Sequence, residues 1–337
     1  MFINKILSRE SGILTYGITP PKQSGATPQR IAEIAAKTIA RIKSLNIDAL
    51  VVYDVQDESS RTSVERPFPY ITALDPFEFA SAYLHDLHVP KIIYRPAGKF
   101  SPAELMKWMD DLRNHKFYPV FVGVPAPGFT VKTTLKEAYS IWSSNSESSV
   151  LGAVTIPERH AASKDEDKRI LDKASCGVSY FISQCVFNID YATKLIEDLG
   201  HACKQQTAQT PAIIFTLTAC GSCKTLEFMD WLGIHLPEDM KEDLKNADNM
   251  LDASVKICLD IAEKIIVLCK THCIPFGFNI ESVAIRKDEI EASVFMLNRI
   301  GEMLQAHCLR DRKTMQLQHT ANISTATDPG QDLLKTA

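Results

Sequence analysis

Carboxylate and amide side chains follow several short apolar runs of this sequence, and they are the residues best suited to chemistry. The densest group is YDVQDESSRT, residues 53–62, which contains Asp54, Asp57 and Glu58. A carboxyl group in such a loop can act as a general acid or a metal ligand, or it can cap a helix and face solvent. Capping is the more frequent role for any single acid, but several acids at one rim favour a functional site.

Two further segments carry polar groups in comparable positions. In IPERH, residues 156–160, Glu158 and His160 lie two apart, so in an extended segment they would face one way. They could form a metal site, an acid/base pair or a loop salt bridge, and the salt bridge is the favoured alternative. Gln184 lies within the apolar run YFISQCVF and needs a hydrogen-bonding partner if it points inward. Its amide suits a pterin-like heterocycle as well as a structural bond.

The motif CGSC, residues 220–223, has the spacing of a redox or zinc motif. A thiol at a helix start can be activated, and backbone N–H groups there can hold a phosphate. A zinc site would need more ligands, and no second CxxC is present. We therefore favour a tight loop with a glycine turn.

The composition is ordinary for a globular protein of the cytoplasm. The chain has 337 residues, 45% of them hydrophobic and 23% charged, with a net charge of −4 and no long basic run. This predicts no nucleic-acid partner. No apolar stretch approaches the roughly 18 residues of a membrane helix, and the opening residues lack a secretory core. Nine cysteines are scattered through apolar patterns, which is typical of a reducing compartment.

Eight short β-rich runs alternate with longer helical patterns, which predicts a (β/α)8 TIM barrel. Most runs are apolar throughout, as in strands that are buried on both faces of a parallel sheet. An open doubly wound sheet is the alternative, but no Gly-rich dinucleotide fingerprint follows any run. We expect the barrel over residues 1–309 and a disordered polar tail over 310–337. The runs are residues 12–18, 48–55, 91–95, 118–124, 150–156, 178–187, 211–217 and 274–283.

Active sites of such barrels lie at the C-terminal ends of the strands. The residues expected there are polar and rich in carboxylates, and they lack a close cluster of His and Cys, so we expect no tight zinc site. They are Thr19, Tyr53, Asp54, Gln56, Asp57, Glu58, Tyr94, Arg95, Lys99, Gly123, Thr155, Glu158, His160, Gln184, Thr216, Thr218, Asn279 and Glu281.

The order of several motifs resembles the methylenetetrahydrofolate reductase family. The match runs from about residue 14 to residue 304. Its strongest piece aligns four residues with the pattern of that family, namely Lys173, Gly177, Gln184 and Phe187. Each piece is weak alone, and the common order makes the resemblance specific. The motifs are YGITPP, VVYDVQDESSRT, SPAEL, GAVTIPERH, DKASCGVSYFISQCVFN and FGFNIES.

The resemblance implies a flavoprotein of folate one-carbon metabolism. In that family FAD binds at the strand ends, NADH or NADPH reduces the flavin, and a hydride passes to methylenetetrahydrofolate. Gln184 matches a glutamine that contacts the pterin, Lys173 a lysine at the flavin phosphates, and Glu166 an acid near the flavin sugar. We assign further rim residues by their place, with Asn279 and Glu281 to the folate and with Tyr53, Tyr94 and His160 to the cofactor.

The chain departs from the family at the position of its catalytic acid. The family carries a proton-donating glutamate on its first strand, and Gly17 stands in that place. We expect the donor to come from the loop after the second strand, with Glu58 ahead of Asp57 for its longer reach. Other family positions fall on Val52, Tyr94, Val124 and Asp172.

Two alternatives to a reductase remain. One is a folate-binding protein without flavin, and the other is a barrel enzyme that uses Glu158, His160 and Asp54 around a divalent metal. The oligomeric state is open, and a homo-oligomer is possible.

Overall fold

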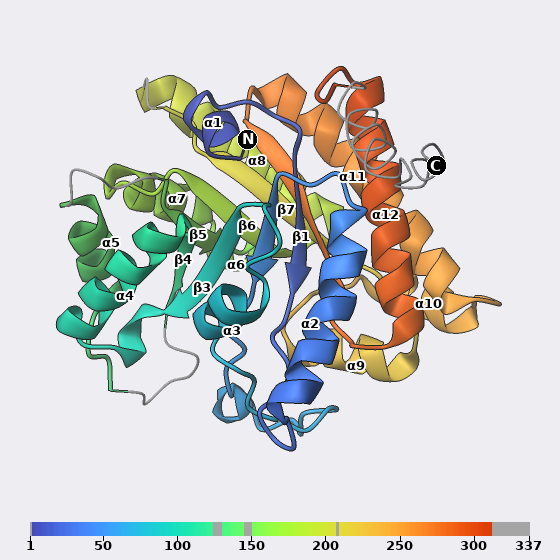
Figure 1. Cartoon of the computed structure of the whole chain (residues 1–337). Coiled ribbons are helices and arrows are strands. Elements are labelled where there is room, and N and C mark those ends of the chain that lie inside the picture. Colours follow the sequence, from blue (N-terminus) through green and yellow to red (C-terminus); the bar gives the residue numbers. More distant parts are fainter. Residues whose placement is uncertain (1, 124–129, 145–149, 207–208, 312–337) are drawn as a thin grey trace, which may run out of the picture.

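The strands close into a single barrel, as the alternation of runs predicts. A computed structural model describes residues 2–123, 130–144, 150–206 and 209–311. All neighbouring strands pair in parallel and in chain order, and β8 returns to β1 (Figure 1). This confirms the (β/α)8 fold. The strands are β1 (Ile13–Ile18), β2 (Ala49–Val52), β3 (Lys91–Pro96), β4 (Tyr118–Val122), β5 (Gly152–Thr155), β6 (Tyr180–Cys185), β7 (Ala212–Thr218) and β8 (Phe276–Glu281).

Helices surround the barrel, and several of them begin at residues whose side chains cap the first turn. The Thr27 side chain accepts a hydrogen bond from the Arg30 N–H at the start of α2, and Ser101 and Glu104 form a capping box at α4. No helix in the described ranges is long and apolar enough to cross a membrane. The α-helices are α1 (Phe2–Leu7), α2 (Pro28–Lys43), α3 (Pro76–Tyr83), α4 (Pro102–His115), α5 (Leu135–Ser143), α6 (Pro157–Ser163), α7 (Glu166–Ser175), α8 (Ile189–Gln206), α9 (Cys223–Trp231), α10 (Glu238–Asn246), α11 (Met250–His272) and α12 (Lys287–Ala306), with 3-10 turns η1 (Ser59–Arg61) and η2 (Ala97–Lys99).

The interior of the barrel is filled by side chains and closed at its N-terminal end by α1. Phe2 is fully buried, and its ring lies 5.3 Å from the Tyr180 ring and 5.7 Å from the Tyr118 ring. Above this plug, aliphatic side chains from the strands form a continuous apolar cluster. A second, larger cluster lies between the barrel and its helices. The barrel is therefore a packed core, and its open end is the rim at the C-terminal ends of the strands, where Tyr53 and Glu281 are partly exposed.

An ion cluster ties both ends of the described chain to the closed end of the barrel. The Asp48 carboxylate lies 2.9 Å from the Lys5 Nζ, accepts the Leu14 N–H at 2.8 Å and pairs with the Arg310 guanidinium. It adjoins a hollow of about 670 Å³ on this face. Arg310 is the first residue of the expected tail, yet its side chain is only 7% exposed. Residues 312–337 of that tail lie outside the described residues.

Candidate functional site

Three adjacent strands bring Tyr53, Asn279 and Glu281 together at the open end of the barrel. β1 pairs with β2 on one side and with β8 on the other. The Asn279 amide donates to the Tyr53 hydroxyl at 2.7 Å, and its carbonyl accepts the Thr15 hydroxyl at 2.9 Å. Asn279 is fully buried, whereas Tyr53 and Glu281 are partly exposed. A buried amide thus fixes the positions of the groups that face the opening.

Gly17 is the residue that makes room for the Glu281 carboxyl group. A Cβ atom at Gly17 would lie 2.8 Å from the Tyr53 ring and 3.2 Å from the Glu281 Oε2 atom. The first contact is too short for a Cβ atom, and the second is tighter than most such contacts. A carboxyl group therefore does stand beside the end of β1, but β8 supplies it.

Burial dominates the electrostatics of this group. It raises the pKa of Glu281, while hydrogen bonds from Tyr53, Cys185 and Asn279 oppose the rise. Burial and the nearby Glu281 charge likewise keep the pKa of Tyr53 well above its usual value. A carboxyl group that holds its proton to higher pH is suited to donate it to a bound ring nitrogen.

Aromatic and amide groups complete the wall of the opening. The Tyr53 and Tyr94 rings meet edge to face with centroids 4.8 Å apart. On β6, the Gln184 carbonyl accepts the Cys185 N–H at 3.2 Å, and its amide reaches the Leu232 carbonyl at 3.4 Å. The second bond is long, so the Gln184 amide can exchange it for a ligand.

A second polar group lies at the ends of β2 and β3. Arg95 forms an ion pair with Asp75 at 2.7 Å and lies 3.8 Å from Asp54. Burial raises the pKa of Asp54 to about 6, although Arg95 opposes the shift. Gln56 links Asp54 to Lys99 through its amide. The charges of this group compensate one another within the chain, and the group lies at the rim of the barrel.

Asp57 and Glu58, the predicted proton donors, lie in the loop beyond the end of β2. Asp57 is exposed, and its carboxylate accepts the Ser59 N–H at 3.0 Å and the Ser59 hydroxyl at 2.6 Å. These bonds lower the pKa of Asp57, which disfavours proton donation. Glu58 is partly buried and precedes η1.

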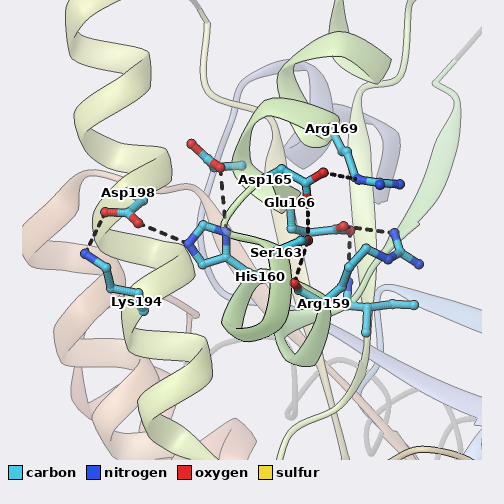
Figure 2. Close-up of polar contacts among 10 residues, drawn as sticks. Arg159, His160, Ser163, Asp165, Glu166, Arg169, Lys194 and Asp198 are labelled. Carbon is cyan, nitrogen blue, oxygen red and sulfur yellow. Dashed lines mark hydrogen bonds and ion pairs between the residues drawn. The ribbon is translucent and has the colours of Figure 1, made fainter.

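The IPERH segment folds as the short helix α6, so the expectation of an extended segment with Glu158 and His160 on one side is wrong. Two residues along a helix rotate a side chain by roughly 200°, which separates the pair. His160 faces the outer helices, where its Nε2 atom lies 3.1 Å from Asp198 and its Nδ1 atom 3.6 Å from Asp167 (Figure 2). The structure therefore does not combine Glu158, His160 and Asp54, and no group of His, Cys, Asp and Glu in the described part of the chain could hold a metal.

Glu166 and Lys173, assigned to the cofactor by the resemblance, bind groups of the chain itself. The Glu166 carboxylate is fully buried, accepting the Ile156 N–H at 3.1 Å and the Arg159 guanidinium at 2.9 Å (Figure 2). Lys173 donates to the Val154 carbonyl at 2.8 Å. These bonds fasten α6 and α7 to β5.

The CGSC motif forms the turn into α9. The Cys220 N–H donates to the Ser254 hydroxyl at 2.8 Å, and the Gly221 N–H donates to Glu289 at 2.9 Å. Burial raises the pKa of the Cys220 thiol to about 12, so it is not an activated nucleophile.

One solved structure is similar to this chain in both sequence and fold. It is an uncharacterised protein from Clostridium thermocellum that binds two copies of 5-methyl-5,6,7,8-tetrahydrofolic acid. It is 42% identical to the chain, with a TM-score of 0.79, and the match covers 90% of this chain and 100% of that one.

Two dihydropteroate synthases show a more distant similarity to this chain. The Vibrio fischeri ES114 enzyme is 8% identical with a TM-score of 0.44, and the Xanthomonas albilineans enzyme is 11% identical with a TM-score of 0.42. Each match covers 88% of this chain and 94% of the synthase. No protein-family model matches the chain, and no curated protein matches it.

Proposed function

Because this chain belongs to the family of the Clostridium thermocellum protein that binds 5-methyltetrahydrofolic acid, we propose that it binds a reduced folate at the open end of its barrel. The identity of 42% over the whole length of that relative is the observation that carries the proposal. The polar group around Glu281 gives the proposal a place in the molecule.

The chemistry of the opening suits a pterin ring. A pterin is a flat heterocycle with hydrogen-bond donors and acceptors along its edges. Tyr53 and Tyr94 provide aromatic surface, and Asn279, Glu281 and Gln184 provide polar groups in fixed positions. An apolar wall with a few convergent polar groups is the usual construction of a small-molecule site.

Titration calorimetry of the full chain with 5-methyltetrahydrofolate tests the proposal. We expect saturable binding, and we expect no competition from p-aminobenzoylglutamate, which lacks the pterin ring. Absence of saturable binding would remove the proposed function.

Gln184→Ala should weaken folate binding about fivefold, which corresponds to the loss of one hydrogen bond of about 1 kcal/mol. The melting temperature should hardly change, because one of the two bonds that Gln184 makes within the chain is long. Calorimetry and thermal unfolding measure the two effects. The exposed Gln205→Ala on α8 is the matched control. A fall in stability with normal affinity would show that Gln184 is structural.

Flavin-dependent reductase activity remains a prediction from the resemblance. The bonds of Glu166 and Lys173 within the chain do not fit the flavin contacts that the resemblance assigns to them, so we derive no step through flavin. Yellow colour and flavin absorbance of the purified protein would support FAD binding. If it also reduces methylenetetrahydrofolate with NADH or NADPH, comparing Glu58→Gln with Glu281→Gln identifies the proton donor. A colourless protein that binds folate without turnover would leave binding as the function.

A further inference from the structure

Glu158 has a carboxyl oxygen that is buried and has no partner. The residue follows β5 at the start of α6, beside β6, which carries Gln184. The backbone N–H groups of Glu158 itself and of His235 face its carboxyl group and oppose the rise in pKa that burial causes. Its Oε2 atom is shielded from solvent and has no hydrogen-bond partner among the described residues. A buried acceptor left in this state costs about 1–3 kcal/mol.

The titratable groups around Glu158 contact other partners or are themselves acidic. On its own helix, Arg159 pairs with Glu166, and His160 pairs with acids of α7 and α8. On the α9–α10 connection, the His235 ring stacks on Tyr191 of α8 at 5.3 Å. Two further titratable neighbours are Cys185 on β6 and Glu281 on β8. Burial raises the pKa of the Cys185 thiol, and the Glu158 charge adds to this rise. The same thiol donates a hydrogen bond to the Glu281 carboxyl group.

The two carboxyl groups near Cys185, those of Glu281 and Glu158, therefore differ in the hydrogen-bond donors that surround them. Glu281 already accepts hydrogen bonds from Tyr53, Asn279 and Cys185. For Glu158, only backbone N–H groups of the described residues oppose the rise in pKa, and its Oε2 atom has no hydrogen-bond partner among those residues. A ligand that brings two parallel N–H donors would satisfy Glu158, as an amidine-like edge does for a carboxylate.

We propose that Glu158 receives the ring N–H and the neighbouring amino group of the pterin's aminopyrimidinone edge, and that Gln184 donates to the carbonyl oxygen of the same edge. This inference rests on the proposed folate function, and it names the residues that recognise the pterin ring. The connection between α9 and α10 holds both side chains, through the Leu232 carbonyl for Gln184 and the His235 N–H for Glu158. The pair would select rings with a donor–donor–acceptor edge.

The protonation of Glu158 gives this arrangement a pH signature. Burial raises the pKa of Glu158 to about 7 in the free protein, and donors from the ligand would lower it again. The carboxyl must then lose its proton for the ligand to bind when the pH is below about 7. Affinity should be full above that pH and should fall as the pH drops through it, by up to about tenfold per unit.

Calorimetry with 5-methyltetrahydrofolate between pH 6 and pH 8.5 tests the proposal on the wild type, Glu158→Gln and the exposed control Glu291→Gln. We expect Glu158→Gln to bind about tenfold to hundredfold more weakly at high pH, as for the loss of hydrogen bonds to a charged group. Its pH dependence should also be flat, whereas the control should behave as the wild type. A wild-type profile that is flat across this range would overturn the assignment even if Glu158→Gln fails to fold.

A folate analogue without the 2-amino group provides an independent measurement. The wild type should bind it more weakly than the parent compound, and Glu158→Gln should bind both about equally. Equal binding of both compounds by the wild type, or unchanged affinity of Glu158→Gln for the parent, would overturn the role of Glu158 alone. Failure of the wild type to bind 5-methyltetrahydrofolate would instead overturn the proposed function.

Discussion

Glu281→Ala is expected to lower the affinity for 5-methyltetrahydrofolate by about 30-fold to 1,000-fold, which corresponds to about 2–4 kcal/mol. The substitution removes the carboxyl group at the centre of the proposed site. It also leaves the Tyr53 hydroxyl and the Cys185 thiol without their shared acceptor. Calorimetry at pH 8 measures the loss.

The control for this prediction is Glu291→Ala, an exposed glutamate on α12 whose ion pair with Lys287 spans 3.6 Å. It should bind like the wild type. Near-normal affinity of a folded Glu281→Ala protein would contradict the placement of the pterin beside Gly17. Thermal unfolding of both variants separates a loss of binding from a loss of structure.

Asp48→Ala should reduce the free energy of unfolding by about 3–5 kcal/mol at pH 7, the usual effect of removing one partner from a buried ion cluster. The side chain is 10% exposed, and its removal leaves the Lys5 ammonium and the Arg310 guanidinium without their common anion. Urea unfolding measures the difference. Asp110→Ala, which removes an exposed carboxylate from its pair with Arg113, should cost no more than about 1 kcal/mol.

The effect of Asp48→Ala should depend on pH in one direction. Burial alone would raise the pKa of Asp48, but Arg310 and Lys5 outweigh it, so the folded pKa lies below 3.8. The contribution is then full above the unfolded pKa of about 4 and is lost as the pH falls through the folded value. Wild type and variant should therefore converge in stability on acidification. A constant difference down to acidic pH would show that packing, rather than charge, stabilises this cluster.

The positions of the strands could be predicted from the sequence because each buried parallel strand is a short apolar run bounded by polar residues. The run at residues 118–124 corresponds to Tyr118–Val122, and the run at 211–217 corresponds to Ala212–Thr218. Helix starts were predictable for the same local reason, since Thr27 and Ser101 cap helices within three residues of themselves.

The site was only partly predictable, because its geometry depends on contacts between distant residues. The sequence places Gln184, Asn279 and Glu281 at the rim, and it predicts that the loop after the second strand supplies the acid that Gly17 cannot provide. It does not predict that the Glu281 carboxyl group lies beside Gly17. Barrel closure instead brings β8 beside β1, across a separation of 264 residues between Thr15 and Asn279. Nothing local in the sequence reveals that pairing.

The residues assigned to a cofactor show a second reason why the site is only partly predictable from the sequence. A motif match identifies residue types, but it does not show which face of a helix carries them. His160 belongs to a seven-residue helix, and its ring lies among acids of the outer layer. Glu158, two residues earlier, carries the unpartnered oxygen that the motif match left without a role.

The plug formed by Phe2 determines the direction from which a ligand can approach. In the described part of the chain, side chains fill the barrel from Phe2 up to the level of Tyr94. A flat ring would therefore enter from the rim, and a long substituent on it would extend outward into solvent.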